Sequence, residues 1–248
     1  MSSVFDSYGA YYNLLYKDKD YSAEVSYVDA LLKRHGNKMQ SLLEFGSGTG
    51  IHGRLLAEKG YQITGIEMSE QMVSKVVESP GFHCQQGDIR HVRLNRKFDA
   101  VCSLFHVMSY QTTNQDILDA MTSASEHLSP GGLFIFDFWY TPAVYAQKPE
   151  VREKRMADEQ VKITRFAEPR LFPNENRVDV HYKIRTQENS SGKQHEFDEV
   201  HPMRHFSLPE IDLLASATGF VRIQAEEFLT AAPPSEKTWG VCVVLRRQ

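Results

Sequence analysis

Short apolar runs alternate with helix-spaced apolar positions over the first 140 residues of the chain. A nearly continuous apolar run is typical of a strand buried on both faces of a parallel sheet, whereas apolar spacings of three and four indicate an amphipathic helix. Glycine and proline separate these segments, as expected at turns and helix ends. We therefore predict helices between five strands, which lie at 41–45, 61–66, 82–86, 98–105 and 133–138.

The pattern becomes more polar from residue 141 to about residue 206. Apolar and polar residues alternate over Val178–Ile184, and Pro173–Asn176 carries turn signals, so this part is predicted to be an antiparallel β meander. A capping box at Ser207–Glu210 then begins a helix that Gly219 ends. Two final strands are predicted at 220–228 and 239–245.

Together these elements predict an α/β protein with a Rossmann-like, mostly parallel seven-stranded sheet, helices on both faces and an inserted β meander. We expect four parts along the chain. They are an N-terminal helical lid at 1–40, a ligand-binding core at 41–140, an inserted β cap at 141–206, and a C-terminal helix and hairpin at 207–248 that complete the core. The cap is expected to cover the site or to contact a second copy of the chain.

The lid is predicted from tyrosines near the N-terminus. Tyr12 and Tyr16 are one helical turn apart, so both rings lie on one helix face. Two interpretations remain open: the rings pack on the main domain, or they close over ligands, because tyrosine combines an apolar ring with a polar tip. The next segment, with Val25, Val28 and Leu31 on one face, is predicted to be a helix that ends near Gly36.

Composition narrows the possible partners. The chain has 248 residues, a formal net charge of −4 and a sequence pI of about 6.2, and its basic residues form no long run, so nucleic acid is disfavoured. Cys84, Cys102 and Cys242 are widely spaced, which indicates buried thiols and neither a disulfide framework nor a zinc site. We find no leader pattern and no apolar span of membrane length, and expect a cytoplasmic protein without a membrane partner.

The glycine-rich turn after the first strand is the main candidate for ligand binding. Gly48, Gly50 and Gly53 fit a dinucleotide pattern, G-x-G-x-x-G. Glu44 and Gly46, together with the next two glycines, also fit an E-x-G-x-G-x-G turn. A dinucleotide brings a pyrophosphate, which prefers bare backbone N–H groups, so an acid at the mouth of the turn suits a cationic ligand better.

Acidic residues also follow the second and third strands. Glu67 lies roughly 20 residues beyond the turn, where a carboxylate can accept hydrogen bonds from both ribose hydroxyls of an adenosine. Asp88 can accept a hydrogen bond from an adenine amino group while Ile89 covers the ring. The full set of predicted cofactor contacts is Glu44, Gly46, Gly48, Glu67, Met68, Asp88, Ile89 and Leu104.

Side chains that follow the fourth and fifth strands are candidates to meet a second ligand, because open α/β sheets bind ligands at this edge. His106 and Tyr110 follow the fourth strand, and Trp139 ends the fifth. The last strand of the cap adds four candidates, His195, His201, Arg204 and His205, whose spacing is not that of metal ligands. We therefore predict no metal site.

With these features in line, the sequence resembles the class I S-adenosylmethionine-dependent methyltransferases. The matching segments are Glu44–Gly50, Glu67, Gly87–Ile89 and Leu128–Gly132. A narrower set resembles the amino-sugar N,N-dimethyltransferases of antibiotic pathways, namely Tyr12–Tyr16, Lys19–Tyr21, Ser103–Phe105, Ser109–Tyr110 and His201–Phe206. The chain departs from those enzymes at Asn13, where Asp is common, and at Asp137–Tyr140, where they tend to carry Glu-Pro-Trp-Trp.

The resemblance implies an enzyme that binds S-adenosylmethionine and methylates nitrogen or oxygen of a small molecule, with a nucleotide-linked sugar expected as the acceptor. Tyr12 would lie over the methyl-transfer zone and Tyr110 would face the substrate. For an amine acceptor, loss of a proton to solvent can suffice, whereas a hydroxyl acceptor would profit from a base, for which His106 is the candidate, with His201 or His205 behind it. The predicted substrate contacts are Tyr16, Trp139, His201, Arg204 and His205. Two alternatives are an NAD-dependent oxidoreductase and a non-catalytic protein that binds S-adenosylmethionine. A homodimer through the meander is also expected.

Overall fold

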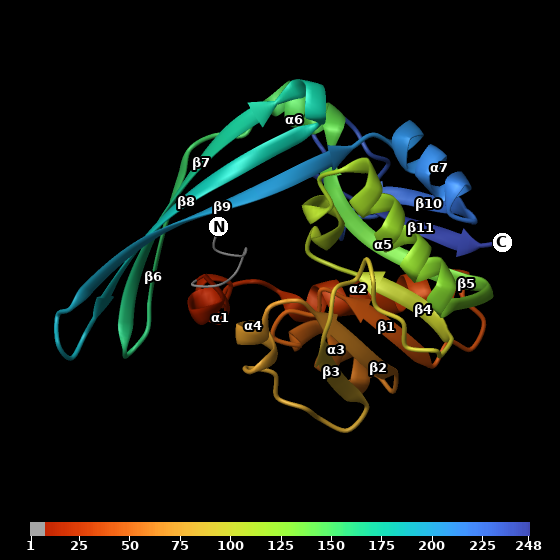
Figure 1. Ribbon diagram of the computed structural model, residues 1–248, viewed down its shortest axis with the longest axis horizontal. Helices are drawn as coiled ribbons and strands as arrows, with labels where there is room; N and C mark the ends of the chain where they lie inside the picture. Colours follow the sequence, from red (N-terminus) through yellow and green to blue (C-terminus); the bar gives the residue numbers. More distant parts are fainter. Residues whose placement is uncertain (1–7) are drawn as a thin grey trace.

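The computed structural model describes residues 8–248, and its centre is a twisted sheet with strands in the order β3-β2-β1-β4-β5. All neighbours in this part pair in parallel (Figure 1). β11 pairs antiparallel with β5, and β10 pairs antiparallel with β11. The bounds are β1 Ser41–Phe45, β2 Gln62–Glu67, β3 Phe82–Gln86, β4 Phe98–Ser103, β5 Leu128–Tyr140, β10 Phe220–Glu227 and β11 Gly240–Arg247. The predicted α/β class and the closing hairpin are thus confirmed.

Helices cover both faces of this sheet because successive side chains of a buried strand point to opposite faces. On one face, Leu133 and Ile135 of β5 pack with α2 and α3. On the other, Phe134 and Phe136 pack with α5 and α7. All four side chains are fully buried. The helices are α1 Tyr12–Leu15, α2 Tyr21–His35, α3 Ile51–Glu58, α4 Glu70–Val73, α5 Asn114–His127, α6 Thr141–Gln147 and α7 Leu208–Ala217, with 3₁₀ turns η1 Tyr8–Tyr11, η2 Val107–Tyr110 and η3 Pro173–Glu175.

Three local predictions need correction. The apolar positions Met72, Val73, Val76 and Val77 predict a helix that begins after Ser69 and ends before Ser79. In the structure this helix ends at Val73, and Val77 is 60% exposed. The strand predicted at 133–138 already begins at Leu128. The segment Leu128–Gly132, which the family resemblance places in a turn before that strand, therefore belongs to β5, and the register with β4 shifts there. The helix α6 was not predicted; proline near its start suits the first turn of a helix.

The inserted part is a four-stranded antiparallel sheet, β6 Arg152–Ala157, β7 Val161–Phe172, β8 Arg177–Glu188 and β9 Gln194–Phe206. Its strands are long and arch away from the core over the side where α1 lies (Figure 1). Two pairings join it to the core: Trp139 and Tyr140 of β5 pair with His205 and Phe206 of β9.

The short helix α1 lies between this inserted sheet and the core. Leu15 is fully buried against Ile163 and Ile184 of the sheet. Thr49 Oγ1 in the glycine turn donates a hydrogen bond of 2.8 Å to Asn13 Oδ1, which ties the same helix to the core. α1 therefore bridges the two parts of the chain beside the carboxyl ends of the parallel strands. No helix in the described part of the chain is both long and apolar enough to cross a membrane.

Candidate active site

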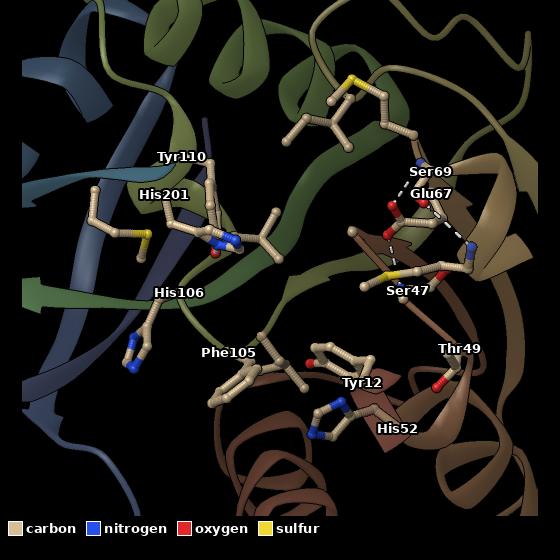
Figure 2. A pocket seen from close by; sticks show the side chains of 18 of the residues that line it. Tyr12, Ser47, Thr49, His52, Glu67, Ser69, Phe105, His106, Tyr110 and His201 are labelled. Carbon is tan, nitrogen blue, oxygen red and sulfur yellow. Dashed lines mark hydrogen bonds between the residues drawn. The ribbon is translucent and has the colours of Figure 1, made fainter. Parts of the chain in front are cut away.

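A cavity of about 410 Å³ lies at the carboxyl ends of the parallel strands (Figure 2). The loops after β1, β2, β3 and β4 line one side of it together with Trp139 of β5, and α1 and the inserted sheet line the other. This edge is where open α/β sheets bind their ligands. The cavity contains most of the residues singled out in the sequence, namely Tyr12, Tyr16, Gly46, Gly48, Glu67, Met68, Asp88, Ile89, Leu104, His106, Tyr110, Trp139 and His201.

The glycine turn forms the floor of the cavity at the end of β1. Gly46 has a φ of +68°, and a Cβ at this position would come within 2.5 Å of Val107 Cγ2, so only glycine fits. The backbone N–H groups of Gly46 and Ser47 both donate to the Ile66 carbonyl of β2. The turn is therefore held against the neighbouring strand and leaves open space on its ligand side.

Glu67 at the end of β2 supports the turn and faces the cavity. Its Oε2 accepts a hydrogen bond of 2.9 Å from the Gly48 N–H, and its Oε1 accepts one of 2.8 Å from the Ser69 N–H (Figure 2). Burial raises the pKa of this carboxyl, and the backbone hydrogen bonds oppose that rise. Each carboxylate oxygen keeps a second lone pair, so the side chain can also accept bonds from a vicinal diol.

Asp88, the predicted adenine contact, is tied to a neighbouring arginine. Both of its oxygens accept hydrogen bonds from Arg90, which also donates one of 2.6 Å to Asp116. Burial alone would raise the pKa of Asp88, but the bonds from Arg90 outweigh it and hold this pKa below its usual range. Ile89 lies beside them and is almost fully buried. Both Asp88 and Ile89 line the cavity.

Glu44 is placed differently from the prediction. It is 2% exposed and does not line the cavity, because its side chain points beneath the glycine turn towards α3, where a Cβ on Gly53 would lie 2.7 Å from its Oε2. Within the described residues, Oε2 has no hydrogen-bond partner. Burial, together with the nearby charge of Glu67, raises the pKa of Glu44 to about 8. Direct contact with a cofactor is therefore corrected to a position under the turn.

A buried charged cluster on the lid side was not predicted. Lys19 Nζ lies 2.8 Å from Glu24 Oε2 and 3.7 Å from the centroid of the Phe105 ring. The same glutamate oxygen lies 2.7 Å from Nε2 of His52, a residue that lines the cavity. Burial lowers the pKa of both Lys19 and His52. The Lys19–Tyr21 segment belongs to the narrower family resemblance, but that resemblance assigns no function to Lys19.

His106 is held in an unusual backbone conformation at the end of β4. Phe105 and His106 have φ values of +66° and +62°, a left-handed conformation that costs side-chain-bearing residues on the order of 1 kcal/mol or more each. The side chain of Asp137 compensates, because both of its oxygens accept the His106 backbone N–H at 3.2 Å and its Oδ2 lies 2.7 Å from the ring Nδ1. Although burial would raise it, these contacts hold the pKa of Asp137 below its usual range.

Tyr110 and His201 meet across the cavity, one from the core and one from the inserted sheet (Figure 2). The Tyr110 hydroxyl lies 2.9 Å from His201 Nδ1, and His201 Nε2 lies 3.2 Å from Glu199 Oε2. Burial raises the pKa of Tyr110 and lowers that of His201. Burial therefore favours a neutral phenol and a neutral imidazole next to the ligand space, and the carboxylate of Glu199 opposes this effect at His201.

Two predicted substrate contacts lie outside the cavity. Arg204 points to the opposite face of β9, where it donates hydrogen bonds to Glu210 and Asn114. His205 Nδ1 lies 2.9 Å from Thr141 Oγ1, within hydrogen-bond distance, and burial lowers the pKa of this histidine to about 4. We therefore correct both to structural residues. Side chains alternate between the faces of β9, which turns Arg204 away from the cavity, and His205 instead contacts Thr141 at the start of the unpredicted helix α6.

The chain is similar to known methyltransferases. A model of the methyltransferase domain matches residues 42–132. The chain is 30% identical over 225 residues to a dTDP-3-amino-3,4,6-trideoxy-alpha-D-glucopyranose N,N-dimethyltransferase from Streptomyces venezuelae, which covers 90% of this chain and 92% of that protein. It is 26% identical to a dTDP-3-amino-3,6-dideoxy-alpha-D-glucopyranose N,N-dimethyltransferase from Streptomyces fradiae, over 88% of this chain and 82% of that protein.

Solved structures show the same fold. A sugar N-methyltransferase from Streptoalloteichus superposes with a TM-score of 0.80 at 21% identity, over 100% of this chain and 94% of that one. An amino pentose methyltransferase from Micromonospora echinaspora, solved with S-adenosylmethionine bound, superposes with a TM-score of 0.77 at 22% identity, over 100% and 99%.

Replacing Glu67 tests its predicted role. We expect Glu67→Ala to weaken binding of S-adenosylhomocysteine by about 1–3 kcal/mol, because the Gly48 N–H and the ribose hydroxyls lose their acceptor. Isothermal titration calorimetry measures the change, and Glu58→Ala, an exposed acid at the end of α3, is the matched control. Equal affinities in the wild type and Glu67→Ala would disprove the ribose assignment.

The raised pKa of Glu44 predicts a pH dependence of stability. Between its unfolded value near 4.5 and its folded value of about 8, the folded protein holds a proton that the unfolded chain has lost, so this residue's contribution falls as pH rises through that interval. Glu44→Gln cannot titrate, and its melting temperature relative to the wild type should rise from about pH 5 to about pH 8. Differential scanning fluorimetry of the ligand-free protein measures this, and a difference that stays constant with pH would contradict the assignment.

Proposed function

The chain belongs to the class I S-adenosylmethionine-dependent methyltransferases and resembles their amino-sugar dimethyltransferases, and from this premise we propose that its acceptor is the amino group of a nucleotide-linked sugar. The observation that carries the proposal is the single cavity that joins the glycine turn and Glu67 at one end to His106, Tyr110 and Trp139 at the other. One enclosed space can thus hold a methyl donor and an acceptor side by side.

The residues at one end fit the cofactor. Glu67 offers acceptors for ribose hydroxyls, and Gly46 and Gly48 line the cavity without a side chain that would obstruct the amino-acid part. When bound, S-adenosylmethionine supplies a methyl group on a positively charged sulfur.

The residues at the other end suit a small amine. Trp139 and Trp239 line the cavity with ring centroids 5.5 Å apart, and Tyr182 adds a third ring from the inserted sheet. Aromatic faces attract cations and exclude water, so they can hold an amine next to the site of methyl transfer without hydrating it. Tyr12 from the lid completes this wall, and burial raises the pKa of its phenol, which stays neutral.

His106 is the residue we propose to accept the acceptor's proton. Its Nδ1 faces Asp137, so Nε2 is the ring nitrogen that can take up a proton, and the buried carboxylate stabilises the resulting imidazolium. Each N-methylation releases one proton, and a second methylation of the same nitrogen requires that this proton leave first. The paired acid and histidine provide that exit next to the acceptor.

The acceptor is tested with a matched pair of substrates. We expect dTDP-3-amino-3,6-dideoxyglucose to be converted to methylated product, seen by mass spectrometry with purified enzyme and S-adenosylmethionine. The corresponding 3-hydroxy sugar nucleotide should remain unmodified. Methylation of the hydroxy sugar alone would show that the enzyme transfers methyl groups to oxygen, and turnover with neither would leave the sugar proposal unsupported while cofactor binding can still be measured.

Replacing His106 tests whether it accepts the proton of an amine acceptor. For an amine, His106→Ala should lower the methyl-transfer rate about 10- to 100-fold near pH 7 and recover towards the wild type near pH 9, where the free amine no longer needs a base. The affinity for S-adenosylhomocysteine should stay unchanged, because His106 lies at the acceptor end. A loss of similar size at both pH values would argue against proton acceptance by this histidine.

A further inference from the structure

A buried glutamine that lines the cavity has no part in the mechanism proposed above. Gln111 directly follows the 3₁₀ turn η2 and is 8% exposed. Its backbone N–H donates a hydrogen bond of 3.2 Å to the Met108 carbonyl. Its side-chain amide, however, makes no hydrogen bond with any residue that the structure describes. A buried amide without a partner is costly, so this side chain requires an explanation.

The other small neutral polar side chains of the cavity are engaged within the protein. Among the residues that the structure describes, the lining serines and threonines are Ser47, Thr49 and Ser69, and each of their hydroxyls has a partner. These contacts join the glycine turn to β3 and to α1, and they cap the start of α4. The amide of Gln111 supports no such element, so both of its polar groups remain available to a ligand.

Two contacts show on which side of the cavity this glutamine lies. Tyr110, the preceding residue, reaches His201 of β9, with 2.9 Å between the hydroxyl and Nδ1. Arg204 Nη2 of the same strand donates a hydrogen bond of 2.8 Å to Asn114 Oδ1. The segment 110–114 therefore runs along β9, and Gln111 lies between the two contacts. This position is at the acceptor end, where the core meets the inserted sheet.

The surroundings of Gln111 leave its amide to the ligand. Pro202 and Met203, the residues of β9 between the same two contacts, also line the cavity. Neither side chain carries a hydrogen-bond donor, and the sulfur of Met203 is a weak acceptor. His106 precedes the 3₁₀ turn that Gln111 follows, so both side chains enter the cavity from the two ends of one turn. An acceptor that presents its amine to His106 brings its neighbouring groups towards this amide.

A primary amide is complementary to a hydroxyl group. It accepts hydrogen bonds at its oxygen and donates them from its nitrogen, and a hydroxyl group can do both in return. It is also neutral, so it adds no charge beside a nitrogen that becomes positive when it receives a methyl group. A sugar carries hydroxyl groups on the carbons that flank the amine-bearing carbon, whereas a simple alkyl amine does not.

We propose that Gln111 binds a hydroxyl group next to the acceptor amine and thereby selects a hydroxylated amino sugar. This inference rests on the proposed function, because it takes an amino sugar as the acceptor. A site that hydrogen-bonds a hydroxyl group rejects an analogue that lacks it, since the buried amide is then left without a partner. Gln111 is therefore a residue that determines acceptor specificity, and it has no role in binding the cofactor.

Three sugar nucleotides test this assignment in steady-state kinetics at saturating S-adenosylmethionine. One is dTDP-3-amino-3,6-dideoxyglucose, which carries hydroxyl groups on both carbons next to the amine-bearing carbon, and the others are its 2-deoxy and 4-deoxy counterparts. For the wild type, we expect loss of one of these hydroxyls to raise KM about tenfold. Gln111→Met has a side chain of similar length without an amide. It should raise KM for the parent sugar by a similar factor and show no further loss with that deoxy sugar.

Gln115→Met is the matched control. Gln115 is exposed at the start of α5 and donates a hydrogen bond of 2.8 Å to Asp119, so its replacement should change KM by no more than about twofold. Both variants should keep the wild-type affinity for S-adenosylhomocysteine and the wild-type melting temperature, which shows that they are folded.

Four results would overturn the role of Gln111. In the wild type, which does not depend on the folding of a variant, the result is equal KM values for all three sugars. In Gln111→Met, it is an unchanged KM for the parent sugar, an equal loss for all three sugars, or weaker binding of S-adenosylhomocysteine at an unchanged melting temperature. In each case, methylation of the parent sugar by the wild type would leave the proposed function standing. Absence of that methylation would overturn the proposed acceptor and the role of Gln111 together.

Discussion

The buried carboxylate of Asp137 is the interaction on which the rest of the site depends. It is 1% exposed in the middle of the sheet, where an unpaired charge would be very costly, and it is satisfied by the backbone and ring of His106. The same carboxylate stabilises the left-handed backbone conformation of Phe105 and His106 after β4, because it accepts the His106 N–H. That bend directs the Phe105 ring towards Lys19 and leads into the 3₁₀ turn that carries Tyr110. One acid therefore positions groups at both the cofactor end and the acceptor end.

Two other buried acids differ because of their immediate surroundings. Glu67 accepts two backbone N–H bonds, which favour its charged form and fix it beside the glycine turn. Glu44, one strand away, has an oxygen without a partner among the described residues and shares the negative field of Glu67, so its charged form is disfavoured. The first can accept hydrogen bonds from a ligand. The second adds negative potential beneath the turn only at higher pH, which suits a cationic ligand without presenting a competing contact.

Short sequence patterns correctly predicted the elements of the fold whose formation depends on neighbouring residues in the chain. The parallel strands, the glycine turn and the acid at the end of β2 all follow from short-range composition, and the structure reproduces their order. Errors arose where long-range packing decides: Val77 continues a helical stripe but finds no surface to cover. The Lys19, Glu24 and His52 cluster joins α2 to α3 and could not be read from spacing. Asp137 did carry a signal, because an acid inside an apolar strand demands a partner.

The core carries the residues of the methyl-donor end, whereas the inserted sheet contributes to the acceptor end. This separation explains how such a fold can change its acceptor and keep its cofactor. Glu67 and the glycine turn are fixed by bonds within the Rossmann-like core and would be unaffected by changes in β6–β9. The inserted sheet reaches the cavity through His201 and Tyr182, and it is joined to the core by two strand pairings, by α1 and by side-chain contacts of β9. Because successive residues of its strands alternate between faces, inner-face positions such as Tyr182 can vary independently of the outer surface. Acceptor specificity can therefore diverge on this sheet without disturbing the methyl-donor end.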